Sequence, residues 1–259
     1  MDAQDTGREM MSVIVKYSVE QATEFAAKEF ARIVQRAADS RGACAVAMAG
    51  GTTPYVLYRK LAQTVATGKV PWEKVEVFFG DERDVPLDNV ESNYCMARRT
   101  LLDNVPIEPT KVHPMRGDAE DLQAAAAEYE DVVRDLVPAD PGGVPRFDLV
   151  LLGMGADGHT ASLFPGTEAL DVSDRLVIAY HVPVLGRKRM TFTFPLINAA
   201  RDIVLLVTGE DKADAVARLL GHDEAAKRPI PAARIHTDDG RITLILDAAA
   251  AKQTGREPG

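Results

Sequence analysis

The chain has 259 residues, of which 46% are hydrophobic and 27% are charged, and this is enough apolar sequence for one large globular domain with a substantial core. Its formal net charge of −9 and its isoelectric point near 5.1 argue against a general nucleic-acid-binding or membrane-surface protein, because both of those surfaces are polyanionic and would repel it. We therefore expect a small-molecule substrate and neither a nucleic-acid nor a membrane partner, in a monomer or a small homo-oligomer.

The chain ends and the cysteines bear on where the protein works. Residues 1–12 lack the basic and then apolar layout of a signal peptide, and no apolar run approaches the roughly 18 residues that cross a bilayer. Cys44 and Cys95 are far apart and form no C-x-x-C motif, so neither a disulfide framework nor a thiolate metal site is suggested. We expect a cytoplasmic protein in which residues 1–259 form a single α/β domain, with residues 1–12 and 253–259 frayed.

Apolar runs of strand length alternate with helical patterns along the chain. Ser18 and Gln21 have the spacing of a capping box at the start of the first predicted helix. Helices are expected at residues 18–39, 54–66, 92–103, 118–136 and 211–220, the second with Pro54 at its first position. Strands, several of them apolar throughout as in covered parallel sheets, are expected at residues 43–49, 75–79, 147–152, 176–182, 190–194, 203–208 and 242–246. This alternation predicts an α/β fold with a Rossmann-like, mostly parallel sheet and helices on both faces.

A glycine-rich loop, Gly50-Gly51-Thr52-Thr53, follows the first strand candidate and opens the helix that starts at Pro54. Free backbone amides and the helix dipole converge at such a helix start, so a phosphate could sit there with both threonine hydroxyls as further donors. The G-K-[ST] ending of a P-loop is absent from this segment. Ordinary capping of the helix by Thr53 is the structural alternative.

A charged loop, Gly80-Asp81-Glu82-Arg83-Asp84, follows the strand candidate at residues 75–79. Charge clusters are usually solvated surface, but this one stands at the carboxyl end of an apolar strand, as the glycine loop does. Further positive charge lies at Arg187-Lys188-Arg189 and at Lys212, where a plain surface charge is the alternative. If the strands are parallel, these loops open on one edge of the sheet, and their basic side chains offset the negative net charge for an anionic substrate.

The segment from Gly153 to Gly166 reads GMGADGHTASLFPG and contains a literal G-x-G-x-x-G after an apolar strand. Dinucleotide binding by that pattern also needs a long helix after the glycines and an acidic residue at the end of the next strand. Pro165 and Gly166 limit any helix here to one or two turns, and the next strand ends in Tyr-His-Val-Pro without an acid. We therefore expect no dinucleotide; the glycines let backbone amides crowd around a ligand and set Asp157 and His159 at the rim.

His159 is the candidate catalytic base. Imidazole is the side chain best suited to take a proton from water near neutral pH, and Asp157, two residues earlier, could orient the ring or support its charge. The structural alternatives are a surface-loop histidine and an Asx-turn aspartate. The five histidines show no i, i+4 pair and no H-E-x-x-H motif, and no G-x-S-x-G elbow occurs. We therefore expect no metal, no cofactor and no serine nucleophile.

Taken together, these motifs resemble those of the 6-phosphogluconolactonases, within a wider family that also contains the glucosamine-6-phosphate deaminases. The resemblance runs from about Val19 to Asp247, and its most specific part is the segment 153–166, which resembles the lactonase signature at every position. Supporting segments are residues 50–54, 80–83, 92–94, 189–195 and 231–233. The resemblance implies a sugar-phosphate isomerase-like fold.

The resemblance also implies hydrolysis of 6-phospho-D-glucono-1,5-lactone to 6-phosphogluconate in the oxidative pentose phosphate pathway, without a metal or an organic cofactor. It implies that His159 activates water with Asp157 as its partner, and that Arg83 binds the substrate or stabilises negative charge. The residues expected around the sugar phosphate are Gly50, Gly51, Thr52, Thr53, Asp81, Arg189 and Lys212. The phosphate contact itself stays open among the basic residues Arg83, Arg187, Lys188, Arg189 and Lys212.

Two alternatives share the fold. The deaminase branch should carry a further acid just after the shared Asp-Gly-His, in an Asn-Glu-Pro-like segment, but Ser162-Leu163-Phe164-Pro165 stands there instead. A non-catalytic sugar-phosphate sensor should lack His159 or gain a DNA-binding segment, and the sequence shows neither change. The lactonase interpretation therefore fits these residues better than either alternative.

Overall fold

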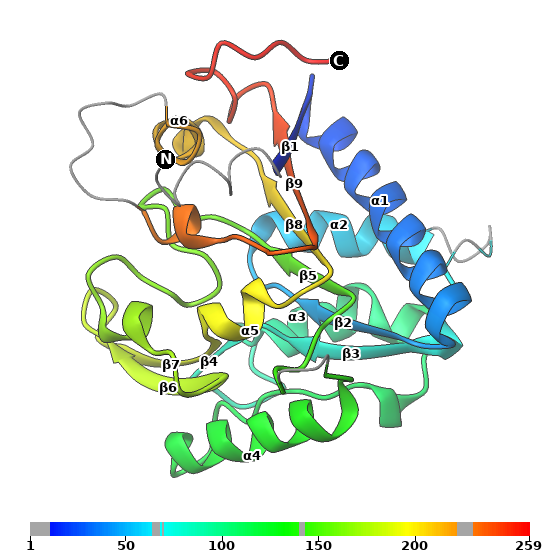
Figure 1. Ribbon diagram of the computed structural model, residues 1–259, viewed down its shortest axis with the longest axis vertical. Coiled ribbons are helices and arrows are strands. Elements are labelled where there is room, and N and C mark those ends of the chain that lie inside the picture. Colours follow the sequence, from blue (N-terminus) through cyan, green and yellow to red (C-terminus); the bar gives the residue numbers. More distant parts are fainter. Residues whose placement is uncertain (1–10, 64–67, 69, 140–142, 222–229) are drawn as a thin grey trace.

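The computed structural model describes residues 11–63, 68, 70–139, 143–221 and 230–259. Its main sheet has the strand order β1-β9-β8-β5-β2-β3, and each neighbouring pair is parallel (Figure 1). The predicted α/β fold with a mostly parallel sheet and helices packed against it is confirmed. The strands of this sheet are β1 (Met11–Lys16), β2 (Cys44–Met48), β3 (Val75–Phe79), β5 (Leu149–Leu152), β8 (Asp202–Val207) and β9 (Arg241–Asp247).

A second, smaller sheet holds β4 (Asp81–Arg83), β7 (Arg187–Phe192) and β6 (Val177–Val182) in that order, all antiparallel. The strands predicted at residues 176–182 and 190–194 therefore lie outside the parallel sheet. Their connection explains this, since a four-residue turn can join only antiparallel neighbours, whereas a parallel pair needs a crossover of a dozen or more residues. The second of them also begins earlier than predicted and ends before Phe194, which starts a helix.

The helices are α1 (Val19–Arg41), α2 (Thr52–Gln63), α3 (Asn93–Thr100), α4 (Leu122–Leu136), α5 (Phe194–Asn198) and α6 (Ala213–Leu219). Short 3-10 turns lie at Trp72–Lys74, Leu102–Asn104, Pro109–Lys111, Glu168–Asp171, Glu210–Lys212 and Pro231–Arg234. The predicted cap of α1 is confirmed: Ser18 Oγ accepts the N–H of Gln21 at 3.2 Å. The Gln21 side chain accepts in return from Tyr17, one residue earlier than a standard capping box. Helix α4 begins later than predicted, because Asp121 caps it by accepting two backbone N–H groups.

One buried apolar cluster extends through the main sheet and its helices, from Val15 to Ala251. Helix α1 contributes a stripe that includes Ala26, Phe30 and Ile33, spaced three to four residues apart, and it packs along β8 and β9 (Figure 1). Because the parallel strands are covered by this packing, their side chains are buried almost throughout.

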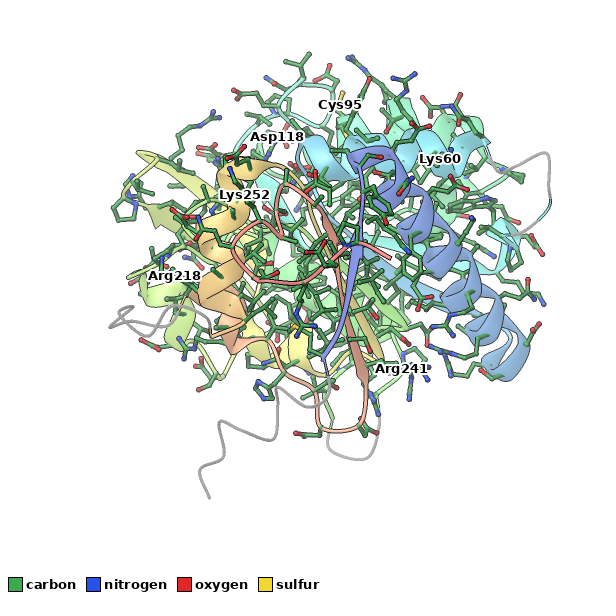
Figure 2. The ribbon with its side chains drawn as sticks, turned by 90° about the horizontal axis from the view of Figure 1, so that it is seen from above. Lys60, Cys95, Asp118, Arg218, Arg241 and Lys252 are labelled. Carbon is green, nitrogen blue, oxygen red and sulfur yellow. The ribbon has the colours of Figure 1, made fainter. Side chains whose placement is uncertain are left out.

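Described residues near both chain ends are paired, although residues 1–12 and 253–259 were predicted to be frayed. Met11 and Ser12 belong to β1, where they pair with Ile242 and Thr243 of β9, and residues 1–10 lie outside the described part of the chain. In the C-terminal tail, the Gly259 N–H donates to the Val15 carbonyl at 3.1 Å. Lys252 Nζ lies 2.5 Å from Glu210 Oε1. Figure 2 shows Lys252 beside α6. The tail therefore pairs one backbone carbonyl on the outer side of the edge strand β1.

Candidate active site

The strand order reverses between β2 and β5. From β2 the chain continues to β3 on one side, whereas β8 and β9 follow β5 on the other side. All six strands run in the same direction, so the loops that follow them open on one edge, and open α/β sheets bind ligands where the order reverses in this way. The glycine loop at residues 50–53 and the segment 153–166 follow these two central strands.

The glycine loop forms the N-terminus of α2. The helix begins at Thr52, and the Tyr55 N–H donates to the Gly51 carbonyl at 3.1 Å, so Thr53 and Pro54 lie inside the first turn. Thr53 is therefore not the capping residue, and Pro54 is tolerated at the third position because first-turn N–H groups have no acceptor within the helix. Thr53 Oγ1 lies 3.1 Å from Thr208 Oγ1, which ties this loop to the loop after β8.

Gly155 and Asp157 hold the imidazole of His159. Asp157 Oδ1 lies 2.6 Å from His159 Nδ1 and also accepts the His159 backbone N–H at 3.1 Å. A Cβ on Gly155 would come within 2.2 Å of the imidazole, so only glycine leaves room for the ring. Because the carboxylate accepts at Nδ1, that nitrogen carries the proton and the lone pair of the neutral ring is at Nε2. The side chains of His159 and Asp157 are 31% and 46% exposed, so water reaches both.

Asp157 is held in its ionised form. Burial by itself would raise the pKa of this carboxyl, but the hydrogen bonds from the ring and backbone of His159 outweigh burial and leave the pKa below its ordinary value. An ionised Asp157 remains a pure acceptor, which keeps the proton on Nδ1 and supports a positive charge on the ring.

Asp81 is buried beneath the loops at the carboxyl ends of the strands and is not on the surface. It is 8% exposed; one carboxylate oxygen accepts from Ser162 Oγ at 2.6 Å and the other from Asn93 Nδ2 at 3.1 Å. Asn93 in turn lies against Gly50, where a Cβ would come within 1.8 Å of Asn93 Oδ1. Asp81 thus connects the segment that carries His159 to the glycine loop through two residues that our sequence analysis did not single out as site residues.

Glu82 anchors α3 next to Asp81. This fully buried carboxylate accepts the N–H groups of Asn93 and Tyr94 and the hydroxyl of Ser92, at 2.7 to 2.9 Å. Burial raises the pKa of Glu82, and these hydrogen bonds oppose the rise. The resemblance had paired residues 80–83 with 92–94, which was the available signal for this contact, but the role of Glu82 was not predicted.

Two arginines lie opposite each other on neighbouring strands of the second sheet. Arg83 of β4 pairs in register with Arg189 of β7, and Arg189 is only 12% exposed. Burial and then the nearby charge of Arg83 lower the pKa of Arg189. Like charges directly opposite on a ladder are unfavourable, so this pair favours an anion beside it. Asp84 lies 3.6 Å from Arg189 and also binds Arg187, at 2.9 Å. Arg187 contacts Glu91 as well, at 2.8 Å, and Lys188 is exposed.

Lys212 lies in the segment that follows β8. It ends the 3-10 turn Glu210–Lys212 that follows β8, and its Nζ lies 2.9 Å from Asp211. The contact of Thr53 with Thr208 puts the loop that leads to Lys212 beside the glycine loop. Arg83 and Arg189 belong to the second sheet, whose strand β4 follows β3 in the chain.

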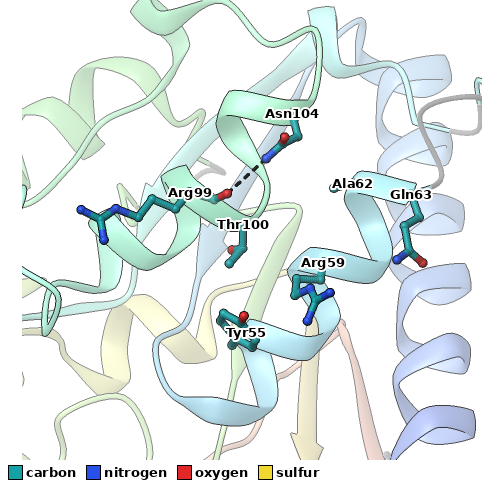
Figure 3. A pocket seen from close by; sticks show the side chains of 7 residues that line it. All are labelled: Tyr55, Arg59, Ala62, Gln63, Arg99, Thr100 and Asn104. Carbon is teal, nitrogen blue, oxygen red and sulfur yellow. Dashed lines mark hydrogen bonds between the residues drawn. The ribbon is translucent and has the colours of Figure 1, made fainter.

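A separate hollow of about 490 Å³ lies between α2 and α3 and is lined by residues of both helices (Figure 3). Tyr55 and Arg59 contribute from α2, and the Arg59 guanidinium is 5.9 Å from the Tyr55 ring centroid. The Arg99 side chain extends away from Arg59 in Figure 3, so the two cations do not converge on one point. None of the predicted site residues lines this hollow.

A metal-binding cluster and a membrane-spanning helix are both absent from the described residues. These residues contain no group of three or more His, Cys, Asp or Glu side chains that could hold a metal ion. Within the same residues, no helix has the length and apolar character needed to span a membrane.

Comparison with known proteins gave matches over most of the chain. The family model described as glucosamine-6-phosphate isomerases/6-phosphogluconolactonase matches residues 18–244. The chain is 42% identical over 219 residues to a 6-phosphogluconolactonase of Synechocystis, covering 85% of this chain and 88% of the relative. It is 37% identical over 235 residues to a 6-phosphogluconolactonase of Streptomyces coelicolor, covering 87% and 89%.

Solved structures show the same likeness. The 6-phosphogluconolactonase of Trypanosoma brucei superposes with a TM-score of 0.80 at 28% identity, covering 93% of this chain and 97% of that chain. A monomeric glucosamine-6-phosphate deaminase superposes with a TM-score of 0.77 at 23% identity, covering 94% and 100%, which shows a shared fold.

Proposed function

The chain belongs to the family of glucosamine-6-phosphate isomerases and 6-phosphogluconolactonases, and we propose that it hydrolyses 6-phospho-D-glucono-1,5-lactone to 6-phosphogluconate with His159 as the general base. It is a hydrolase of the lactonase kind, because its curated relatives at 37 to 42% identity carry that name. The observation that carries the role of His159 is its geometry: Nδ1 is fixed by Asp157 at 2.6 Å while the ring stays partly open to water.

In this proposal, the lone pair at Nε2 of His159 takes a proton from a water molecule. The resulting hydroxide attacks the lactone carbonyl carbon, and the carbonyl oxygen becomes an oxyanion. When the ring C–O bond breaks, the departing oxygen takes the proton back from the imidazolium. Asp157 supports the positive charge that the ring carries between the two transfers. A positioned base of this kind contributes roughly 10²–10⁴-fold to the rate.

The substrate needs positive charge in two places, at its phosphate and at the oxyanion. The site offers positive charge on two flanks: the N-terminus of α2 together with Lys212, and the pair Arg83 and Arg189. We assign Arg83 to the developing oxyanion, and Arg189, Lys212 and the loop Gly50-Gly51-Thr52-Thr53 to the phosphate and sugar. Asp81 acts from below, through its hydrogen bonds to Ser162 and Asn93, and not by direct contact with the substrate.

The deaminase alternative receives no support from the residues around the base. Position 164, in the segment where that branch should carry a further acid, holds a buried phenylalanine. Our proposal also places the reaction in the oxidative pentose phosphate pathway and in the cytoplasm, in a monomer or small homo-oligomer. The pathway follows from the substrate, and the two unpaired cysteines, Cys44 and Cys95, are in keeping with a reducing compartment.

The test is the rate at which freshly generated 6-phosphogluconolactone disappears, measured above its spontaneous hydrolysis. We expect wild-type protein to accelerate it, and the absence of any acceleration would overturn the proposal. Arg189→Gln and Lys212→Gln should then be compared on the phosphorylated lactone and on unphosphorylated glucono-1,5-lactone. A residue that contacts phosphate should lose about tenfold or more in kcat/KM on the first substrate and little on the second. An equal loss on both substrates would exclude that residue from phosphate binding.

A further inference from the structure

The Phe164 ring stacks on the imidazole of His159. The ring centroids are 4.2 Å apart and the ring planes differ by 27°. Phe164 is 7% exposed and belongs to the buried apolar cluster, whereas the His159 side chain is 31% exposed. A buried ring that is held by the core thus forms a fixed surface beneath a ring that water can reach.

The other contacts of His159 do not define the orientation of the imidazole plane. Asp157 Oδ1 fixes the position of Nδ1, but a single hydrogen bond allows the imidazole to pivot about that point. Gly155 approaches the Cε1–Nδ1 edge of the ring, where a Cβ would meet both atoms at 2.2 Å. Because the torsion that turns an imidazole plane has broad energy wells, the plane is set by what packs against its face. Phe164 packs against this face of the imidazole.

The same contact bears on the charge of the ring. An aromatic face carries partial negative charge and attracts a cation placed over it. The imidazole becomes a cation each time it takes a proton from water, so the Phe164 ring stabilises the intermediate form of the base. The charged group that touches the imidazole from its own loop is Asp157, which stays ionised because its pKa is lowered.

We propose that Phe164 is a positioning residue for the catalytic base: it fixes the plane of the His159 imidazole and stabilises the ring while it carries the extra proton. This inference rests on the proposed role of His159 and adds a residue that acts through it without touching the substrate. It also assigns a purpose to the aromatic side chain at this position, where packing alone could be satisfied by an aliphatic one.

The test compares Phe164→Leu with Phe194→Leu, a matched control. Phe194 is also 7% exposed and begins α5, and the Arg234 guanidinium lies 5.2 Å from its ring centroid. Phe164→Leu should lower kcat about tenfold and leave KM unchanged, because a misplaced base slows the chemical step without affecting substrate binding. Phe194→Leu should lose similar thermal stability and keep its kcat. Phe164→Tyr, which restores the aromatic face, should recover most of the lost rate.

A second measurement does not depend on turnover. NMR titration of the His159 ring protons should show a midpoint about half a pH unit lower in Phe164→Leu than in wild type, because the imidazolium loses its aromatic neighbour. If Phe164→Leu is poorly folded, Phe164→Met, which is closer in volume, takes its place.

The outcomes separate the two proposals. Equal losses of kcat in the Phe164 and Phe194 variants, or an unchanged midpoint in Phe164→Leu, would overturn the positioning role while an active wild type upholds the lactonase. A wild type without lactonase activity would overturn the proposed function. The shift of the midpoint would then still report whether Phe164 stabilises the protonated ring.

Discussion

The edge of the main sheet at the amino ends of its strands and the edge at their carboxyl ends differ in how charged side chains are arranged. At the amino-terminal edge, Asp202 accepts from Arg36 and from Arg241 Nε at 3.1 Å, and Asp148 pairs with Arg41 while accepting the Ala45 N–H at 2.9 Å. Here each buried carboxylate meets guanidinium groups from other elements. The carboxyl-terminal edge leads through the loop after β3 to the second sheet, where Arg83 and Arg189 instead lie opposite each other on β4 and β7.

The difference indicates which edge is built for stability and which for a ligand. Opposite charges at the amino-terminal edge join strands and helices that are distant in sequence, and they leave little unbalanced charge. At the other edge, Arg187 and Arg189 share one carboxylate, Asp84, so positive charge remains that an anionic substrate would offset. Since parallel strands put all their carboxyl ends together, one edge collects the loops and the other is free to be closed by ion pairs.

The largest effect is expected from His159→Ala at the ligand edge. The rate should fall roughly 10²–10⁴-fold, because the base is lost, while the melting temperature should change by no more than about 2 °C, since the side chain is partly exposed. Parallel measurement of lactone hydrolysis and thermal unfolding checks this. A melting temperature that drops by many degrees along with the rate would mean that His159 is structural.

Asp148→Ala should show the reverse pattern at the stability edge. It leaves the Ala45 N–H and the Arg41 guanidinium without their buried acceptor, which should cost about 3 kcal/mol of unfolding free energy. For a chain of this size the melting temperature should then fall by roughly 6–12 °C. The activity measured at 20 °C should stay within about twofold of wild type. Asp148→Asn, which keeps one acceptor, should lose less stability, and a large loss of activity in a folded Asp148→Ala would refute the separation of the two edges.

The pH dependence of stability should differ in sign between the edges. Burial raises the pKa of Asp202 to about 6, against the opposing effect of Arg36. The folded state then holds this proton more tightly than the unfolded chain, so the contribution is fully present below about pH 4 and is lost as the pH rises through 6. Relative to Asp202→Asn, wild type should lose up to about 3 kcal/mol of unfolding free energy between pH 4 and 7.

Asp157 provides the matched comparison at the ligand edge. The pKa of Asp157 is lowered, so its contribution is present above the unfolded value and is lost as the pH falls through the folded value. Relative to Asp157→Asn, wild type should therefore gain stability as the pH rises from 3 to 5. Urea unfolding at a series of pH values measures both differences, and trends of the same sign would show that the two carboxylates are not held in opposite ways.

The sequence predicted most of the parallel sheet. The strand at residues 75–79 was placed at its observed bounds, because a short apolar run between polar residues indicates a covered strand. The loop with His159 and the glycine loop were also recognised, since glycines and a histidine after apolar strands are local features. Strand β1 was missed: its residues are only partly buried, and it exists through pairing with β9 at the far end of the chain.

The second sheet could not be predicted from the sequence for a similar reason. Strand β4 consists of three charged residues without an apolar pattern, and it is a strand only because β7 pairs with it. Its pairing decides that Arg83 opposes Arg189 and that Arg187 is bound by Asp84 and Glu91. From the sequence, these basic residues could not be distinguished.

The sequence by itself therefore determined the α/β class, the parallel strands and His159 as the candidate base, because periodicity, glycine turns and the chemistry of imidazole are properties of short segments. Only the tertiary structure decided that Asp81 is buried, that two arginines oppose each other and that Phe164 stacks on His159. Those relations join residues from separate segments or depend on how one loop folds back on itself, and they arise from strand pairing and packing that no local pattern encodes.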